Sequence, residues 1–166
     1  MVSRLTDSRN HMQQIKIKIL QKATAKDCRE MNHLLSQLSL GSIRPSPLTQ
    51  AQFSSLLGQK NVFLLAAMSS GSRDARIIGF VLLYFVKIPS GFLAVSEDLI
   101  VDEPYRKWGV GRLLMEYSIE CAEKKGARHI SLRTNPKRAD AKKLYEQMGF
   151  IEMPTHFFRI NLPRKK

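Results

Sequence analysis

The sequence is poor in cysteine and has no apolar run long enough to cross a membrane. Its only cysteines, Cys28 and Cys121, lie far apart in the chain, which excludes a small disulfide scaffold and fits a reducing compartment. The longest apolar stretches, such as residues 77–86, are shorter than the roughly 20 residues that a spanning helix needs. The first residues also lack the apolar core of a signal peptide. We therefore expect a soluble, unexported, cytoplasmic protein.

Two common kinds of catalytic centre are also missing. No Gly-x-Ser-x-Gly turn occurs, which disfavours a serine hydrolase of that type. The four histidines do not have the spacing of metal ligands, and no acidic cluster resembles a cation site; these histidines are His11, His33, His129 and His156. The sequence predicts no metal.

Acidic residues are scarce relative to basic ones. The chain has 14 Asp and Glu against 27 Lys and Arg, a net charge of +13. Residues 104–143 hold eleven of the basic residues and four acidic ones, a net +7. Such a concentration favours an anionic ligand there, although Lys124 and Lys125 fit an exposed helix end. Nucleic acid stays open as a partner, but no nucleic-acid-binding motif supports it.

A length of 166 residues suits a single domain. We expect a flexible tail over 1–13, with Met12 as an alternative start, a domain over 14–162 and a basic tail over 163–166. The first half predicts a strand over 15–19, a helix over 24–40 ended by Gly41, and a loop over 42–47. A second helix follows, capped by Thr49. The first helix has apolar residues at 28, 31, 34, 35 and 38, and the second has Phe53, Leu56 and Leu57.

The remaining pattern alternates strands and helices. Strands over 61–68 and 77–86, joined by turn residues 69–74, predict an antiparallel hairpin, and residues 92–101 form a third strand. Further strands are expected over 129–134, 150–151 and 156–160. One helix carries an apolar stripe of Val110, Leu113, Leu114, Tyr117 and Cys121, and the next, with Asn135 as cap and Pro136 in its first turn, carries Ala141, Leu144, Tyr145 and Met148. The order β-α-α-β-β-β-α-β-α-β-β predicts an α/β fold, a mixed sheet with helices on both faces.

The third strand leads into a glycine-bearing turn. Gly109 and Gly111 remove two Cβ atoms just where a helix begins, so the backbone N–H groups of residues 107–111 can converge on an anion at the positive helix end. Arg106, Lys107 and Arg112 add positive charge. The turn lacks the third glycine of a dinucleotide fold and the Lys-Ser/Thr of a P-loop. Trp108 either shields a bound ligand or covers the helix start.

A second motif lies about thirty residues downstream, Ala-x-x-Leu-Tyr-Glu-x-x-Gly-Phe over 141–150. Together with the Arg-x-x-Gly-x-Gly turn, it resembles the GNAT superfamily of acetyl-CoA-dependent N-acetyltransferases. The resemblance covers residues 95–150 and implies a mostly antiparallel sheet that splays open beside the cofactor strand. It also implies acetyl-CoA as co-substrate, bound by Leu99, Ile100, Val101, Arg106, Lys107, Trp108, Gly109, Val110, Gly111, Arg112, Asn135, Arg138 and Tyr145.

Two carboxylates and a phenol are the candidate catalytic groups. Strand alternation places Glu97, Leu99 and Val101 on one face, where Glu97 can take the ammonium proton of an acceptor and Asp98 can contact it; both also fit simple ion pairing with a nearby Lys or Arg. The resemblance gives Tyr145 the role of protonating the departing thiolate, whereas periodicity alone makes it a core aromatic. The family often has Asn where this chain has Arg138, and Asn135 is a possible substitute.

These features favour an N-acetyltransferase that moves an acetyl group directly to a primary amine of a small molecule, peptide or protein. The alternative is a non-catalytic module that binds acyl-CoA or nucleic acid. We expect residues 41–49 and the strand connections to set acceptor specificity. Family members are often dimers, so a homodimer is possible.

Overall fold

The computed structural model describes residues 15–38, 46–69, 75–160 and 162. They divide into two compact units, with the boundary after Arg133. No helix among these residues is long and apolar enough to cross a membrane, and no group of three or more His, Cys, Asp and Glu comes together in this part of the chain. The tails expected over 1–13 and 163–166, Met12, Gly41 and the tip of the 69–74 turn lie outside the described residues.

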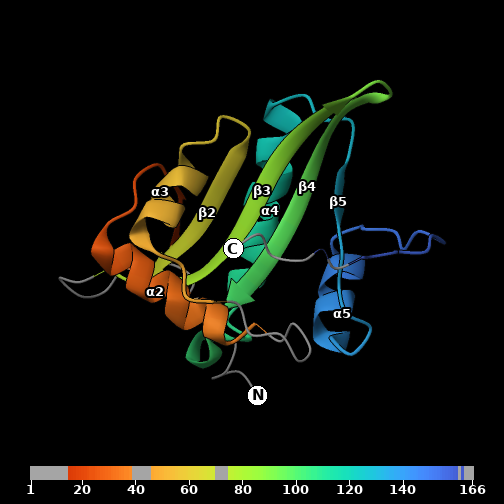
Figure 1. Ribbon diagram of the computed structural model, residues 1–166. Coiled ribbons are helices and arrows are strands. Elements are labelled where there is room, and N and C mark those ends of the chain that lie inside the picture. The colour runs from red at the N-terminus through yellow and green to blue at the C-terminus, as the bar shows by residue number, and fades with distance from the viewer. Residues whose placement is uncertain (1–14, 39–45, 70–74, 161, 163–166) are drawn as a thin grey trace, which may run out of the picture. The chain divides into compact units, whose positions relative to one another are not determined.

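The first unit is built on a five-stranded sheet with the order β1-β2-β3-β4-β5 (Figure 1). Neighbouring strands are antiparallel from β1 to β4, and β5 runs parallel to β4, so the predicted hairpin and the mixed sheet are confirmed. The strands are β1 (Ile15–Leu20), β2 (Val62–Ser69), β3 (Ile77–Ile88), β4 (Gly91–Val101) and β5 (Ile130–Leu132). β5 is shorter than the predicted strand over 129–134.

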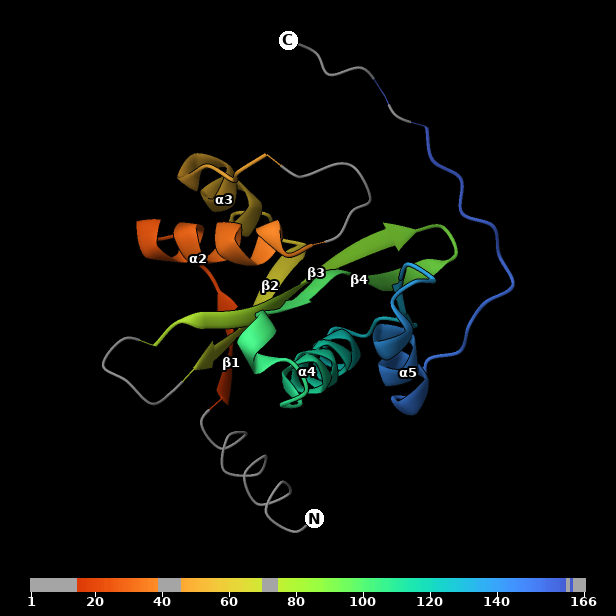
Figure 2. The ribbon, with the colours of Figure 1, turned by 90° about the horizontal axis from the view of Figure 1, so that it is seen from below.

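Helices α2 (Ala25–Ser36) and α3 (Gln50–Leu57) cover one face of the sheet (Figure 2). Each begins with a capping box, in which the hydroxyl of Thr24 or Thr49 accepts a hydrogen bond from the third helical N–H, satisfying a backbone donor that the helix leaves unpaired. The expected apolar stripes are confirmed, since Cys28, Met31 and Leu34 of α2 are buried in one cluster with α3 and the sheet. α2 ends at Ser36, before the predicted residue 40.

Helix α4 (Val110–Lys124) covers the opposite face. Its buried residues are Val110, Leu114, Met115, Ser118 and Ala122, whereas the predicted stripe included Tyr117, whose side chain is exposed. The stripe is therefore rotated from its expected position. Ser118 can be buried because its hydroxyl donates a hydrogen bond of 2.9 Å to the Leu114 carbonyl, which removes the cost of burying a polar group without a partner.

The second unit contains helix α5 (Ala139–Gln147). The prediction that Asn135 caps this helix is wrong: its Oδ1 accepts a hydrogen bond from the Lys137 N–H in a preceding turn, and the N-cap is Arg138. The strands predicted over 150–151 and 156–160 are also absent from the described residues. Strand propensity acts only when a neighbouring strand completes the hydrogen bonds, and Pro154 within this segment has no N–H to donate.

Candidate functional site

β4 and β5 are paired over only part of their lengths. The parallel register joins Ala94, Val95 and Ser96 of β4 to Ile130, Ser131 and Leu132 of β5. β4 continues to Val101, five residues beyond the last pair, and β5 does not accompany it in the described structure. The two strands therefore separate beside the carboxyl half of β4, as the resemblance implies for the cofactor strand.

A β-bulge turns β4 at the point where the strands separate. Leu82 pairs with Glu97 and Phe80 pairs with Ile100, so β4 has one extra residue here, and Asp98 has a left-handed φ of 54°. Before the bulge, Ser96 contacts Met115 of α4; after it, Ile100 packs into the core cluster that includes α2. The prediction that Glu97, Leu99 and Val101 share a face is therefore wrong, because the bulge breaks the alternation between them.

Glu97 forms an ion pair with Arg133, the residue that follows β5. The Arg133 Nε donates to Glu97 Oε1 at 3.1 Å and Nη2 donates to the same oxygen. The register explains the contact, since Val95 faces Ser131 and each partner lies two residues farther along its strand. The hydrogen bond to Glu97 raises the pKa of Arg133. The ion pairing considered for Glu97 is therefore present in the structure, and its catalytic role stays a prediction.

Asp98 lies at the bulge, next to Glu97 in the chain. Its pKa is raised, first by the loss of surrounding water and second by the neighbouring negative charge of Glu97. The bulge thus presents two adjacent carboxylates at the place where β4 leaves β5.

A small pocket of about 300 Å³ lies next to the ion pair. It opens on the sheet face that α2 and α3 partly cover. The chain neighbours of Tyr84 and Val95, namely Leu83, Phe85 and Ala94, pack with Ala122 of α4, so strand alternation turns Tyr84 and Val95 to the opposite face. The strands β3, β4 and β5 all contribute to its wall, which consists of Tyr84, Val95, Ser131, Leu132 and Arg133. Apart from the guanidinium, its polar groups are hydroxyls.

The glycine turn joins β4 to α4 through a short 3-10 helix, Glu103–Tyr105. Lys107 and Gly109 both have left-handed φ angles, 66° and 81°. Gly109 is the N-cap of α4 and has no side chain to satisfy the first helical N–H groups, which leaves them for an anion. Trp108 packs edge-on against Tyr105, with ring centroids 5.1 Å apart.

A buried carboxylate, Asp102, holds this turn to α2. Arg76 donates to its Oδ2, and Gln37 Nε2 donates to its Oδ1 at 2.7 Å, with His33 Nε2 at 3.1 Å from the same oxygen. Burial alone would raise the pKa of Asp102, but the hydrogen bonds from Gln37 and His33, with the contribution of Arg76, lower it overall.

Gln37, the C-cap of α2, also reaches farther into the turn. Its Oε1 accepts hydrogen bonds from the Glu103 N–H and from Arg106 Nη2, both at 3.1 Å, while Arg106 Nε donates to the Val101 carbonyl. The guanidinium of Arg106 thus fastens the turn to α2. The sequence analysis did not identify Gln37 or Asp102 as parts of the site. A signal existed for Asp102, which is a charged residue directly after a buried strand.

In the second unit, Tyr145 is buried and packs edge-on against Phe150. Burial raises the pKa of its phenol, while the positive charge of Arg138 acts in the opposite direction. The phenol therefore stays protonated at neutral pH, as a proton donor must. Asn135 and Arg138, the other predicted cofactor residues of this unit, precede α5.

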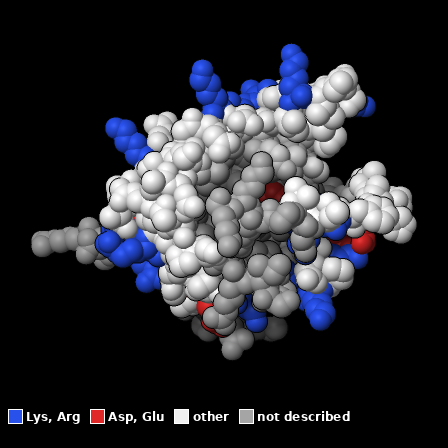
Figure 3. Space-filling view, in the orientation of Figure 1, with Lys and Arg blue, Asp and Glu red and all other residues white. Residues whose placement is uncertain are grey.

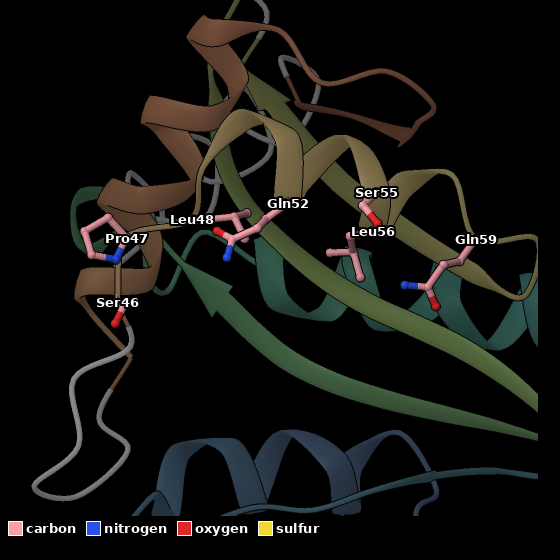
Figure 4. A pocket seen from close by; sticks show the side chains of 7 residues that line it. All are labelled: Ser46, Pro47, Leu48, Gln52, Ser55, Leu56 and Gln59. Atoms are coloured by element: carbon pink, nitrogen blue, oxygen red, sulfur yellow. The ribbon is translucent and has the colours of Figure 1, made fainter. Parts of the chain in front are cut away.

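A second, shallow pocket of about 420 Å³ lies along α3 (Figure 4). Ser46, Pro47 and Leu48 belong to the segment expected to set acceptor specificity, and Gln52, Ser55, Leu56 and Gln59 complete the lining. None of these side chains is ionisable. On the face seen in Figure 3, Lys and Arg side chains lie mainly around the margin.

Comparisons with known proteins show relatives in sequence and in fold. The sequence model described as "Acetyltransferase (GNAT) family" matches residues 20–150. The chain is 30% identical over 102 residues to an uncharacterized N-acetyltransferase of Bacillus subtilis, YhdJ, covering 61% of this chain and 70% of the relative. It is 38% identical over 59 residues to the ribosomal protein bS18-alanine N-acetyltransferase of Escherichia coli, covering 36% of this chain but only 40% of that enzyme.

The fold is similar to that of a Trypanosoma brucei acetyltransferase. The TM-score is 0.71 at 22% sequence identity, and the match covers 89% of this chain and 99% of the other.

Proposed function

Because the chain belongs to the GNAT family of acetyltransferases, we propose that it transfers the acetyl group of acetyl-CoA directly to a primary amine. The observation that carries the proposal is the separation of β4 from β5 next to an uncapped, glycine-bearing start of α4. The first feature leaves a stretch of β4 that β5 does not accompany, and the second leaves helical N–H groups without a side-chain cap. An amide-rich thioester with a pyrophosphate can use both.

The residues present fit acetyl-CoA. The N–H groups of residues 107–111 are suited to the pyrophosphate, because the left-handed Lys107 and Gly109 shape the turn and no side chain caps the helix. Lys107 and Arg112 supply positive charge nearby. Leu99, Ile100 and Val101 are suited to pair with the pantetheine amides as a neighbouring strand would. Acetyl-CoA supplies a thioester carbonyl that an amine can attack.

Glu97 is the proposed proton acceptor, and Asp98 is a proposed contact for the acceptor amine. An acceptor amine arrives mostly as an ammonium ion, and it must lose one proton before its lone pair can form the new C–N bond. Glu97 takes that proton directly or through water, and Asp98 helps to hold the ammonium group beside it. Glu97 afterwards returns the proton to solvent.

Tyr145 is the proposed proton donor. As the C–N bond forms, the C–S bond breaks and the sulfur leaves as a thiolate, which the Tyr145 phenol protonates. The second proton lost by the amine nitrogen restores the phenol through water. The balance is one ammonium ion and one thioester giving an amide, a thiol and a proton.

A thiol-release assay with acetyl-CoA and a panel of amines tests this function. We expect thiol release that depends on the amine, together with an acetylated amine of matching amount by mass spectrometry. Tight acetyl-CoA binding without thiol release from any amine would support the non-catalytic alternative instead.

A further inference from the structure

One carboxylate oxygen of the proposed base, Glu97, already binds Arg133 in the structure. Glu97 accepts two hydrogen bonds from Arg133 on one carboxylate oxygen, and its side chain is 24% exposed against 55% for Arg133. The charge-assisted hydrogen bonds of a guanidinium are strong and occupy the carboxylate oxygen that accepts them. An acceptor amine at Glu97 therefore either shares the carboxylate with Arg133 or offers Arg133 another anion.

The surroundings favour the second course. Asp98 lies beside Glu97 in the chain, so a second carboxylate adjoins the Glu97–Arg133 ion pair, and Arg133 lines the 300 Å³ pocket. The other polar groups that line the pocket are the hydroxyls of Tyr84 and Ser131. This arrangement is complementary to a ligand with both signs of charge, in which the ammonium group meets the carboxylates and an anion meets Arg133.

We propose that the acceptor carries a carboxylate or phosphate next to its amine, and that Arg133 binds this anionic group. The inference rests on the proposed function and adds the chemical class of the acceptor. Arg suits the task because its planar guanidinium binds carboxylate and phosphate with two parallel hydrogen bonds. When the anion takes Arg133, Glu97 is released to accept the ammonium proton.

The size of the pocket limits the acceptor. Ligand pockets usually measure about 300–1,000 Å³, so this one is at the small end and suits a group the size of an amino acid. An acceptor without an anion, such as a polyamine, leaves Glu97 bound to Arg133 and reacts slowly.

Matched acceptor pairs test the inference. The panel contains L-amino acids with their amides, O-phosphoethanolamine with ethanolamine, and spermidine as a cation without an anion. For at least one pair we expect kcat/KM about tenfold or more higher for the anionic member, equivalent to about 1.4 kcal/mol. The pairs distinguish a carboxylate from a phosphate. Chemistry alone favours the amides, whose less basic amines are more often neutral, so the expected preference requires recognition of the anion.

Arg133→Met identifies the residue responsible. We expect the anionic preference to fall below about twofold in this variant, while acetyl-CoA affinity stays unchanged. The ratio of two substrates on one protein does not depend on how much of the variant is folded. Arg128→Met is the matched control: Arg128 is exposed, and its guanidinium donates a hydrogen bond to the Ser90 carbonyl. Its backbone bonds to Phe92, about 17 Å along β4 from Glu97 at roughly 3.4 Å per residue.

The outcomes separate the two ideas. If amines are acetylated but the neutral members or spermidine are preferred, or Arg133→Met keeps the wild-type preference, the acceptor class is wrong and the proposed function stands. If no compound is acetylated, the proposed function fails and the inference fails with it.

Discussion

Asp102 shows how one residue links stability to the site. Its side chain is 2% exposed, and an ionised carboxylate at such a depth is tolerated only when donors surround it. Here the partners are Arg76, which directly precedes β3, His33 of α2 and Gln37, the C-cap of α2. Asp102 therefore joins the sheet, a helix and the glycine turn through one charge.

Asp102→Asn should destabilise the protein by about 1–3 kcal/mol at pH 7, because it removes the charge that these donors satisfy. The pKa of Asp102 is lowered in the folded state, so its stabilisation is complete above the ordinary value of 3.8 and is lost as the pH falls below it. Urea unfolding of both proteins should therefore give curves whose difference shrinks below about pH 4. Glu120→Gln, which breaks an exposed ion pair, is the control and should change little. A difference that grows in acid would contradict the assignment.

Tyr145→Phe separates the proton donor from the core aromatic. The variant keeps the ring and its contact with Phe150 and deletes only the hydroxyl. We expect kcat to fall about ten- to a thousandfold while acetyl-CoA affinity is nearly preserved, since the hydroxyl acts during reaction. Steady-state kinetics with calorimetric binding check both quantities. A wild-type kcat would assign protonation of the thiolate to water or another residue.

At the scale of elements, the turn between β4 and α4 depends on a helix distant in sequence. Gln37 at the end of α2 bonds to Asp102, to the Glu103 N–H and to Arg106, three points within five residues of the turn. These contacts hold the turn to the end of α2. Preorganisation of this kind lowers the entropy that binding must otherwise overcome.

Gln37→Met should therefore weaken acetyl-CoA binding about three- to tenfold, with kcat at saturation preserved, because the side chain keeps its length but loses three hydrogen bonds. Gln50→Leu is the control, since it removes a hydrogen bond of 3.3 Å to Ala23 at the other end of α2. A double-mutant cycle with Arg106→Met should be less than additive. Full additivity would mean that Gln37 does not act through Arg106.

Gly111→Val tests the start of α4. A branched side chain there would block the approach of a phosphate to the backbone N–H groups, so acetyl-CoA binding should weaken at least tenfold, about 1.4 kcal/mol. Calorimetry on the folded variant measures the change. Gly58→Ala is the control, because Gly58 has an ordinary helical φ and its added Cβ would lie 3.4 Å from the Ser54 carbonyl. Unchanged affinity in folded Gly111→Val would overturn the cofactor site.

Local features of the fold could be predicted from the sequence, and features that depend on distant partners could not. The cap at Thr49 and the stripe on α2 follow from neighbouring residues. The bulge at Asp98 depends on how β4 pairs with β3, and the contact of Glu97 with Arg133 depends on the register of β5. Neither register can be read from one strand alone. The predictions of strands over 150–151 and 156–160 were wrong for the same reason, because a strand needs a partner strand.

At the scale of the whole molecule, the net charge of +13 is a long-range field as well as a set of contacts. It draws any anion toward the protein and is screened by salt. The basic excess over residues 104–143 includes the glycine turn, where the proposed pyrophosphate site lies, so acetyl-CoA benefits both from the field and from specific N–H groups. Nucleic acid would benefit from the field alone.

This difference predicts how binding responds to salt. Acetyl-CoA affinity should fall modestly as sodium chloride rises from about 50 to 200 mM, because buried hydrogen bonds to the turn are screened less than exposed charges. Duplex DNA and RNA should bind weakly at the lower concentration and, with several phosphates neutralised at once, should lose most of that binding at the higher one. Calorimetry for acetyl-CoA and gel shifts for the nucleic acids provide the comparison. Nanomolar binding of either nucleic acid at physiological salt would mean that the basic surface has its own nucleic-acid partner.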